Sequence, residues 1–256
     1  MKLIARKLMP YSAGKKLWGD RKQWGLQVRE NDPCWTEWLK VYSSFYDQNQ
    51  REGIGTKVND AGYKVMEQVD LTGKKVLEIG AGDIRHTTYW KSQPSEYLLA
   101  DVSTDMMEKA VSCLQKRKVP YRSFILNRAE KLPLEDNSVD IVVSFYSLEH
   151  LYPLSPYLDE MKRVVKPGGV IVGAIPAEGG IAWGVGRALT SRRWFKKHTS
   201  IDPDKIICWE HPNFADEILA TMDRFFVRQQ LNYWPSQVPL IDPNLVIKFI
   251  YKKIEK

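Results

Sequence analysis

The chain has 256 residues, of which 43% are hydrophobic and 27% charged, as is ordinary for a soluble globular protein with one sizeable domain and some additions. Its longest apolar runs fall short of the roughly 18–20 residues that a membrane-spanning helix needs. The three cysteines are scattered and odd in number, which argues for free thiols in a reducing cytoplasm and against a disulfide framework or a zinc site (Cys34, Cys113, Cys208). We therefore expect no metal.

The net charge of +7 is concentrated in an N-terminal arm. Residues 1–29 hold eight lysines and arginines against one acidic residue, Asp20, whereas the remainder balances at 30 basic and 30 acidic residues. Charges also interrupt the apolar residues of 1–7, so this segment lacks the apolar core of a signal peptide, and we expect a cytoplasmic protein. The arm either packs its apolar side chains on the domain or contacts nucleic acid or an anionic membrane, the latter placing the protein peripherally at the inner membrane surface.

Helices are predicted before the first strand. Residues 1–32 form an irregular or partly helical arm, and 56–69 a helix. Over 33–50, large side chains recur at three- and four-residue spacing and predict a helix with one aromatic face, which is more often core than a cofactor contact (Trp35, Trp38, Leu39, Tyr42, Phe45, Tyr46). We divide the chain into an arm and helical cap over 1–70 and an α/β domain over 71–256.

From residue 71 onward, strands alternate with helices. Strands are predicted at 75–79, 97–101, 122–126, 139–145 and 170–175, with helices between them at 85–92, 104–116 and 156–165. This alternation favours a parallel, doubly wound sheet. A helix at 213–225 and two strands at 226–233 and 245–252 complete the chain.

The stretch 76–83, Val-Leu-Glu-Ile-Gly-Ala-Gly-Asp, joins an apolar strand to a glycine-rich turn. About twenty residues on, the apolar run 97–100 ends in Asp101. Glycines let such a turn approach a ligand closely, because they lack a Cβ atom and tolerate positive φ. A carboxylate at the tip of the second strand can accept hydrogen bonds from two ribose hydroxyls. The layout predicts a nucleoside-binding βαβ unit.

Three further motifs follow: Arg-Ala-Glu-Lys-Leu-Pro-Leu at 128–134, Asp-Ile-Val-Val-Ser at 140–144 and Val-Lys-Pro-Gly-Gly-Val at 165–170. With the glycine turn and Asp101, they closely resemble the class I S-adenosylmethionine-dependent methyltransferases over roughly residues 71–176. The resemblance implies a Rossmann-like, doubly wound, seven-stranded sheet that is mostly parallel with an antiparallel last strand. It also implies S-adenosyl-L-methionine as the cofactor.

The resemblance further implies roles for individual residues. The methionine end of the cofactor would lie against Glu78 and the glycine turn, and the ribose against Asp101. Val102 and Met106 would flank the adenine, and the stretch after the strand at 139–145 would meet the acceptor. The predicted cofactor-binding residues are Glu78, Gly80, Ala81, Gly82, Asp101, Val102, Met106, Ala129, Glu130 and Phe145.

Two positions depart from the family pattern. Ile84 occupies the third glycine position, and Arg128 stands where an acidic residue often lies near the adenine amino group. These departures put individual contacts in doubt. They also keep open a hypothesis from another class, a non-catalytic partner protein that retains the fold.

Methyl transfer from a sulfonium is an SN2 displacement, so holding donor and acceptor in line contributes much of the rate. A hydroxyl acceptor would also need a base, since its proton leaves as the bond forms. The catalytic candidates are His150, just past the strand 139–145, and His211, after an insertion at 176–208; each could instead be structural. The insertion has no acid between 179 and 201, so it forms either a solvated lid or an acceptor clamp in which Arg192 and Arg193 meet an anionic group.

The expected function is methyl transfer to a small-molecule or glycan acceptor, because 176–215 resembles methyltransferases of bacterial surface-polysaccharide pathways. The partner would be a small-molecule, sugar or lipid-linked acceptor with an anionic group, and a lipid or quinone methyltransferase at the membrane is the alternative. Nucleic acid is not expected, since 144–147 lacks the Pro-Pro-aromatic loop that grips a flipped base. Protein arginine methylation lacks its second glutamate near Glu149, and dehydrogenase activity lacks the Gly-x-Gly-x-x-Gly spacing.

Overall fold

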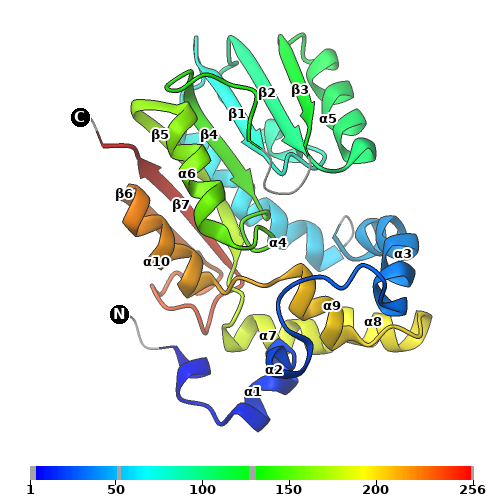
Figure 1. Ribbon diagram of the computed structural model, residues 1–256. Helices are drawn as coiled ribbons and strands as arrows, with labels where there is room; N and C mark the ends of the chain where they lie inside the picture. Colours follow the sequence, from blue (N-terminus) through cyan, green and yellow to red (C-terminus); the bar gives the residue numbers. More distant parts are fainter. Residues whose placement is uncertain (1–3, 51–52, 127–130, 255–256) are drawn as a thin grey trace.

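The computed structural model describes residues 4–50, 53–126 and 131–254, and its centre is a seven-stranded sheet (Figure 1). The strand order is β3-β2-β1-β4-β5-β7-β6. β7 runs antiparallel to β5 and β6, and the other neighbouring pairs are parallel. The predicted Rossmann-like, doubly wound fold is confirmed. The strands are β1 (Lys75–Ile79), β2 (Glu96–Asp101), β3 (Tyr121–Ile125), β4 (Val139–Phe145), β5 (Val165–Pro176), β6 (Val227–Trp234) and β7 (Val246–Lys252).

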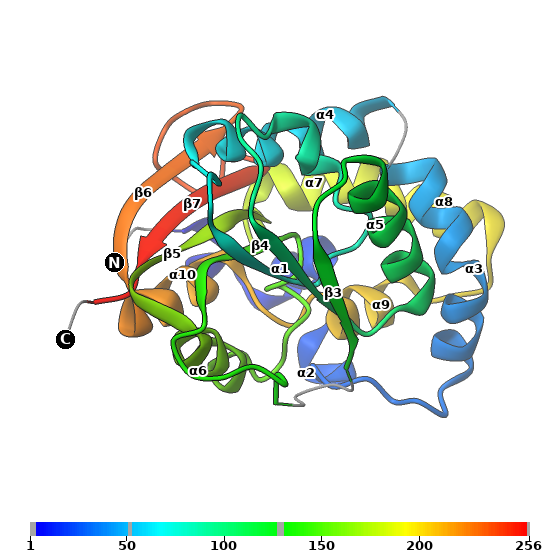
Figure 2. The same ribbon diagram turned by 90° about the horizontal axis from the view of Figure 1, so that it is seen from above.

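Helices cover both faces of the sheet, because alternate strand residues are apolar on each side. Leu77 and Val142 point to one buried cluster, with α6 (Leu154–Val164) and α10 (Ala215–Phe225). Their neighbours Val76 and Val143 point to the other, with α4 (Gly53–Tyr63), η2 (Lys64–Gln68) and α5 (Thr104–Lys116). Figure 2 shows α6 and α10 on one side of the sheet and α4 on the other. Both faces of the sheet are therefore buried, as is usual for parallel strands.

Most elements lie within two residues of their predicted bounds, and three differ by more. The helix predicted over 56–69 begins at Gly53 and ends at Tyr63, where the 3-10 turn η2 follows it. The segment predicted as a helix over 85–92 is a short 3-10 turn, η3 (Arg85–Tyr89), because Trp90 turns extended and packs on Tyr97 with ring centroids 5.1 Å apart. β5 begins at Val165 rather than 170, since Val165 already pairs with Val139 before a bulge accommodates the Lys-Pro-Gly-Gly stretch.

The insertion folds as three helices that pack against the N-terminal arm and cap. It contains α7 (Ile181–Leu189), α8 (Ser191–His198) and α9 (Pro203–Glu210), and the N-terminal part contains η1 (Ala5–Lys7), α1 (Tyr11–Trp18), α2 (Arg21–Trp24) and α3 (Pro33–Gln50). Part of the aromatic face of α3 is core: Trp38 lies 5.4 Å from Phe195 of α8, and Trp35 lies 6.4 Å from Trp209 of α9. Leu39, predicted on the same face, is instead 61% exposed. In Figure 1, α1, α2, α7 and α8 gather beneath the sheet.

The cysteines are free thiols, and Cys208 is fully buried. Burial raises the pKa of the Cys208 thiol to about 12, so this side chain stays protonated and apolar at neutral pH. Within the described ranges, no helix combines the length and apolar character that crossing a bilayer requires.

Candidate active site

The glycine turn and Asp101 meet at the carboxyl edge of β1 and β2. The Gly82 backbone N–H donates to Asp101 Oδ2 across 3.0 Å, and the Ser103 N–H donates to Asp101 Oδ1 across 2.8 Å. Each carboxylate oxygen thus accepts one backbone hydrogen bond and keeps lone pairs for a further donor. Ser103 also caps α5 by accepting from the Met106 N–H. Asp101 is therefore held in a fixed orientation.

The two glycines of the turn serve different needs. Gly80 has a φ of 68°, and a Cβ atom there would lie 2.4 Å from the Ser147 Cβ, so the turn after β1 packs directly on the loop after β4. Gly82 has a φ of 56°, and nothing lies within 4 Å of where its Cβ would be. A ligand can therefore approach the backbone at Gly82.

Exposed apolar side chains flank Asp101. Val102 follows it and is 62% exposed, and Ile125, its register partner at the end of β3, is 50% exposed. Such side chains could be covered by a flat apolar ligand such as adenine. Met106 is buried in α5, and the predicted contacts Ala129 and Glu130, like Arg128, lie outside the described residues.

Glu78 lies in a buried polar network beneath the turn. Tyr97 donates its hydroxyl to Glu78 Oε2 across 2.7 Å, and His86 Nε2 lies 2.9 and 3.0 Å from the two carboxylate oxygens. The Trp90 Nε1–H donates to His86 Nδ1 across 3.2 Å, which leaves Nε2 as the protonated, donating nitrogen. Burial, then the charge and hydrogen bond of Glu78, raise the pKa of Tyr97 well above its ordinary value. Glu78 thus anchors the turn from below.

Other predicted contacts are also built into the core. Ala81 is buried, and the Phe145 ring lies 4.8 Å from His86 and 5.1 Å from Tyr63. The Tyr146 hydroxyl contacts the Val58 carbonyl of α4 at 3.0 Å. These residues connect the cap to the cofactor edge of the sheet.

The structure brings the two predicted catalytic histidines together although 61 positions separate them. The rings of His150 and His211 lie 4.8 Å apart, edge to face. His150 Nδ1 contacts Glu210, with 3.3 Å to Oε2 and a short contact to the carbonyl oxygen, and Trp38 Nε1 donates to Glu210 Oε1 across 2.7 Å. Asn213 Nδ2 donates to the carbonyls of residues 148 and 151, which ties the loop after β4 to the segment after α9.

A buried ion pair completes this acceptor-side cluster, which we define as Glu149, His150, Glu178, Arg187, Glu210 and His211. The Arg187 guanidinium donates to both oxygens of the fully buried Glu178, at 2.9 Å to Oε1 and by a short bond to Oε2. Trp183 Nε1 donates to Glu178 Oε2 across 2.8 Å, and His211 Nδ1 lies 3.0 Å from the same atom. Burial alone would raise the pKa of Glu178, but Arg187 and His211 outweigh it and hold that pKa far below its ordinary value.

Arg187 is thus the insertion arginine that reaches this cluster among the described contacts. Arg192 instead pairs with Asp204 at 2.5 Å, and Arg193 is exposed. The predicted clamp by Arg192 and Arg193 stays a prediction, although Arg192 already has an internal partner.

Glu149 was not among the predicted catalytic residues. Its side chain is 2% exposed, its Oε2 has no hydrogen-bond partner, and His150 Nε2 lies 3.9 Å from its Oε1. Burial raises the pKa of Glu149 to about 7, although the charge on His150 opposes the shift. The two Glu-His dipeptides, 149–150 and 210–211, were the available signal, because an acid beside each histidine doubles the titratable groups at one place.

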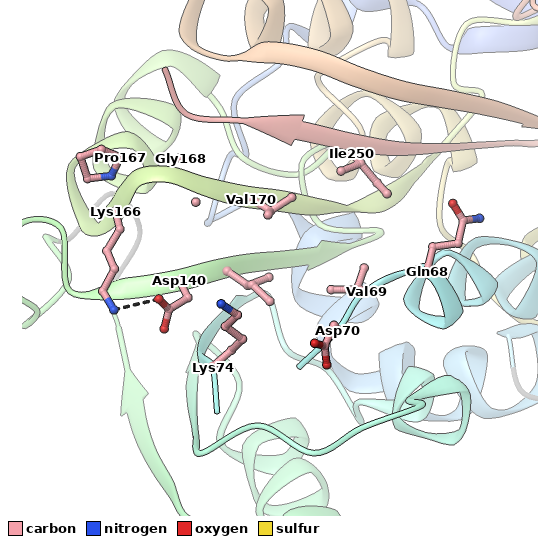
Figure 3. A pocket seen from close by; sticks show the side chains of 12 residues that line it. Gln68, Val69, Asp70, Lys74, Asp140, Lys166, Pro167, Gly168, Val170 and Ile250 are labelled. Atoms are coloured by element: carbon pink, nitrogen blue, oxygen red, sulfur yellow. Dashed lines mark hydrogen bonds and ion pairs between the residues drawn. The ribbon is translucent and has the colours of Figure 1, made fainter. Parts of the chain in front are cut away.

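A separate cavity of about 450 Å³ lies at the opposite, amino edge of the parallel strands (Figure 3). It is lined by residues before β1 and at the starts of β4 and β5, including Asp70 and Lys74, and Lys166 Nζ donates to Asp140 Oδ1 there across 2.8 Å. Ligands of doubly wound sheets bind beyond the carboxyl ends instead. Among the described residues, no group of three or more His, Cys, Asp or Glu is arranged to hold a metal ion.

Comparison with known proteins shows what the sheet region is similar to. Residues 77–173, from β1 into β5, match the family model described as a methyltransferase domain. The chain therefore contains a match to a methyltransferase domain, and its fold is that of S-adenosylmethionine-dependent methyltransferases. A solved S-adenosylmethionine-dependent methyltransferase from Aquifex aeolicus shares the fold over 83% of this chain and 98% of its own, with a TM-score of 0.54 at 16% identity. S-adenosylmethionine is accordingly the cofactor expected of this methyltransferase domain.

Two curated relatives match the same methyltransferase domain. A probable phthiotriol/phenolphthiotriol dimycocerosates methyltransferase of Mycobacterium ulcerans is 34% identical over 42% of this chain and 41% of its own length. A malonyl-[acyl-carrier protein] O-methyltransferase of Hamiltonella defensa is 27% identical over 48% of this chain and 46% of its own. The matched region thus spans less than half the length of these relatives. One relative is named for a dimycocerosate acceptor and the other for malonyl-[acyl-carrier protein].

Proposed function

We propose that this protein transfers the methyl group of S-adenosylmethionine to a hydroxyl oxygen of a lipid or lipid-linked acceptor. The observation that carries the proposal is the position of Glu149, a buried carboxylate past the end of β4 with one unpartnered oxygen. Its pKa of about 7 suits a proton acceptor at neutral pH. The lipid acceptor is supported by the relative named for a dimycocerosate lipid.

The residues at the cofactor edge fit S-adenosylmethionine. Asp101 would accept hydrogen bonds from the ribose hydroxyls, Val102 and Ile125 would cover the adenine, and the open backbone at Gly82 would approach the methionine part. When bound, the cofactor supplies an electrophilic methyl group whose sulfonium leaving group departs as a neutral thioether. Glu78 would then act by positioning, because its oxygens are engaged by His86 and Tyr97.

On the acceptor side, Glu149 would take the hydroxyl proton on Oε2 as the oxygen attacks. His150 is the cation beside Glu149. It would stabilise the Glu149 carboxylate before proton transfer and hold the neutral carboxyl in place afterwards. His211 is neutral at pH 7 but a weak base, since burial lowers its pKa to about 4. The assignment of His150 or His211 as base remains a prediction, and Glu149 is our preferred candidate.

A soluble anionic glycan is the second candidate acceptor. It is favoured by the exposed basic residues of α8, Arg193, Lys196 and Lys197. Labelled methyl transfer to hydroxylated lipids, compared with transfer to sugar phosphates, distinguishes the two acceptors.

The first test is calorimetric titration with S-adenosylmethionine and, separately, S-adenosylhomocysteine. Asp101→Asn should weaken binding at least about tenfold, because one charged hydrogen-bond acceptor is lost. Asp105→Asn, an exposed change in the first turn of α5, is the matched control and should bind as the wild type does. Absence of binding by the wild type, with prebound cofactor excluded by mass spectrometry, would favour the non-catalytic partner protein.

A further inference from the structure

Exposed apolar side chains gather on three short segments that are distant in sequence. The segments are the arm at 8–11, the outer side of α7 and the loop 235–245 between β6 and β7. They hold half of the large apolar side chains that the described residues expose: Leu8, Tyr11, Ile181, Val185, Leu189, Val238 and Leu240. We call this set the apolar face.

Asp242 joins the three segments of the apolar face. Its Oδ2 accepts from the Ala5 N–H across 2.8 Å, and its Oδ1 accepts from the Ile181 N–H across 3.2 Å. Its backbone carbonyl accepts from the Ala182 N–H across 2.8 Å. Trp18 Nε1 also donates to the Gly180 carbonyl across 3.1 Å, which holds α1 against the start of α7. These contacts hold the three segments beside one another, in the lower half of Figure 1.

α7 has the reverse of the usual amphipathic arrangement: its polar side chains face the protein interior and its apolar side chains face solvent. Trp183 and Arg187 hold Glu178 of the acceptor-side cluster. Ile181, Val185 and Leu189, spaced by four residues, lie on the exposed side of the same helix. Three aligned apolar side chains in water are a ridge that a partner would cover.

The surroundings of the apolar face are basic. Apart from Asp242, whose carboxylate accepts hydrogen bonds from the backbone of residues 5 and 181, no aspartate or glutamate occurs in residues 5–19, 181–201 or 235–245. Lys16 of α1 and Arg193, Lys196 and Lys197 of α8 are exposed. α8 begins two residues after α7 ends, so these cations lie on the helix next to the apolar ridge.

We propose that the apolar face and its basic rim bind an anionic membrane surface. An apolar ridge beside cations matches the boundary between acyl chains and acidic headgroups. Because Arg187 lies on the inner side of α7, docking would set the acceptor-side cluster about one helix diameter, roughly 10 Å, from the lipid. This inference concerns a surface and requires neither the cofactor nor methyl transfer.

Vesicle sedimentation tests the inference with the full chain. The wild type should sediment with phosphatidylcholine vesicles that contain phosphatidylglycerol, and much less with phosphatidylcholine alone. Val185→Ser with Leu189→Ser, and separately Lys196→Glu with Lys197→Glu, should each weaken this binding at least about tenfold. High salt should weaken binding as well, since the headgroup charges are screened.

Matched controls distinguish binding through the apolar face from non-specific adsorption to vesicles. Val227→Ser with Ile254→Ser removes exposed apolar residues elsewhere, and Lys116→Glu with Lys131→Glu reverses two exposed charges elsewhere. Both controls should bind vesicles as the wild type does, and circular dichroism should show all variants folded. A wild type that stays in the supernatant, or face variants that bind like the controls, would overturn the inference. The inference would also be overturned if the protein bound an immobilised, purified acyl carrier protein but no vesicles. The partner of the apolar face would then be an acidic protein.

Vesicle binding and cofactor binding fail independently. A protein that binds S-adenosylmethionine but no vesicles would keep the methyltransferase proposal and refute the membrane surface. A protein that binds vesicles through the apolar face but no cofactor would keep the membrane surface and refute the methyltransferase proposal.

Discussion

The rings of His150 and His211 lie 4.8 Å apart, yet their surroundings move their pKa values in opposite directions. Burial would lower the pKa of His150, but Glu210 and Glu149 outweigh it and raise that pKa to about 9. Burial lowers the pKa of His211 to about 4, with Arg187 and His150 adding to the shift and Glu178 opposing it. One cation and one neutral ring can thus share the site without mutual repulsion.

Histidine NMR titration should therefore find His150 protonated and His211 neutral throughout pH 5 to 8. Assignment by His150→Gln and His211→Gln identifies the two signals. His150, whose folded pKa is raised, contributes stability that is full below about pH 6.5 and is lost as the pH rises through about 9. Two rings that both titrate near their ordinary pKa would contradict the cluster as described.

Glu149→Gln should stabilise the fold more at pH 8 than at pH 5. The pKa of Glu149 rises from 4.5 to about 7 on folding, so its ionisation costs stability that grows between those pH values and is constant above them. The gain at pH 8 should exceed the gain at pH 5 by about 2–3 kcal/mol. Urea unfolding at the two pH values measures it.

Glu210→Gln is the matched comparison, with the opposite sign. Burial would raise the pKa of Glu210, but His150 and Trp38 hold it below its ordinary value. Its carboxylate therefore contributes stability above about pH 4.5, and the variant should be less stable than the wild type at pH 8. If both glutamine variants shifted stability in the same direction at pH 8, the pKa assignments would be wrong.

Ile84→Gly should destabilise the fold although Ile84 is strained. The backbone there is left-handed, with φ 46° and ψ 39°, which costs a β-branched residue about 1–2 kcal/mol. The side chain is also 1% exposed, and deleting a buried isoleucine side chain costs about 2–5 kcal/mol. Packing outweighs strain, so we expect a net loss of about 1–3 kcal/mol in urea unfolding.

Ile84→Val is the control for this position. It keeps the β-branched strain and removes one methylene, so it should cost only about 1 kcal/mol. A glycine variant more stable than the wild type would mean that Ile84 is a poor substitute for the family's glycine.

Arg187→Leu should destabilise the protein by about 3–5 kcal/mol, because it leaves Glu178 buried without its bidentate partner. It should also raise the pKa of His211, which Arg187 lowers. Arg187→Lys should not restore the wild type, since an ammonium cannot make the paired bonds. Thermal unfolding and histidine NMR measure the two effects.

Arg193→Leu controls for the loss of an arginine from the same insertion. Arg193 is exposed, so this change should shift stability by no more than about 0.5 kcal/mol. Equal losses from the two leucine variants would show that the buried ion pair has no special weight.

Local pattern predicted much of the fold. α3 at Pro33–Gln50, α5 at Thr104–Lys116 and β4 at Val139–Phe145 have the bounds that the sequence pattern predicts. Each has a strong apolar period with clear stop signals at its ends. Prediction failed where packing between elements set the geometry, as at Trp90, which packs on Tyr97 of the next strand and ends the predicted helix early.

The cofactor edge was partly accessible from the sequence. Spacing alone related the glycine turn to Asp101, and the Gly82–Asp101 hydrogen bond joins them. The sequence could not show that Glu78 is engaged from below, because its partners His86 and Tyr97 reach it only through the packed sheet.

By itself, the sequence determined the doubly wound sheet and the edge where the glycine turn meets Asp101, since apolar period, glycine and strand-end acid act over neighbouring residues or at a fixed spacing. Only the tertiary structure decided the acceptor side. His150 and His211 meet there because the insertion folds back past the end of β4. Glu210 and Glu149 then raise the pKa of His150, whereas burial lowers that of His211 and raises that of Glu149. The free energy of ionising a side chain depends on how far it is shielded from water and on which charges lie near it. Both are set by residues from distant parts of the chain, so a local sequence pattern cannot predict them.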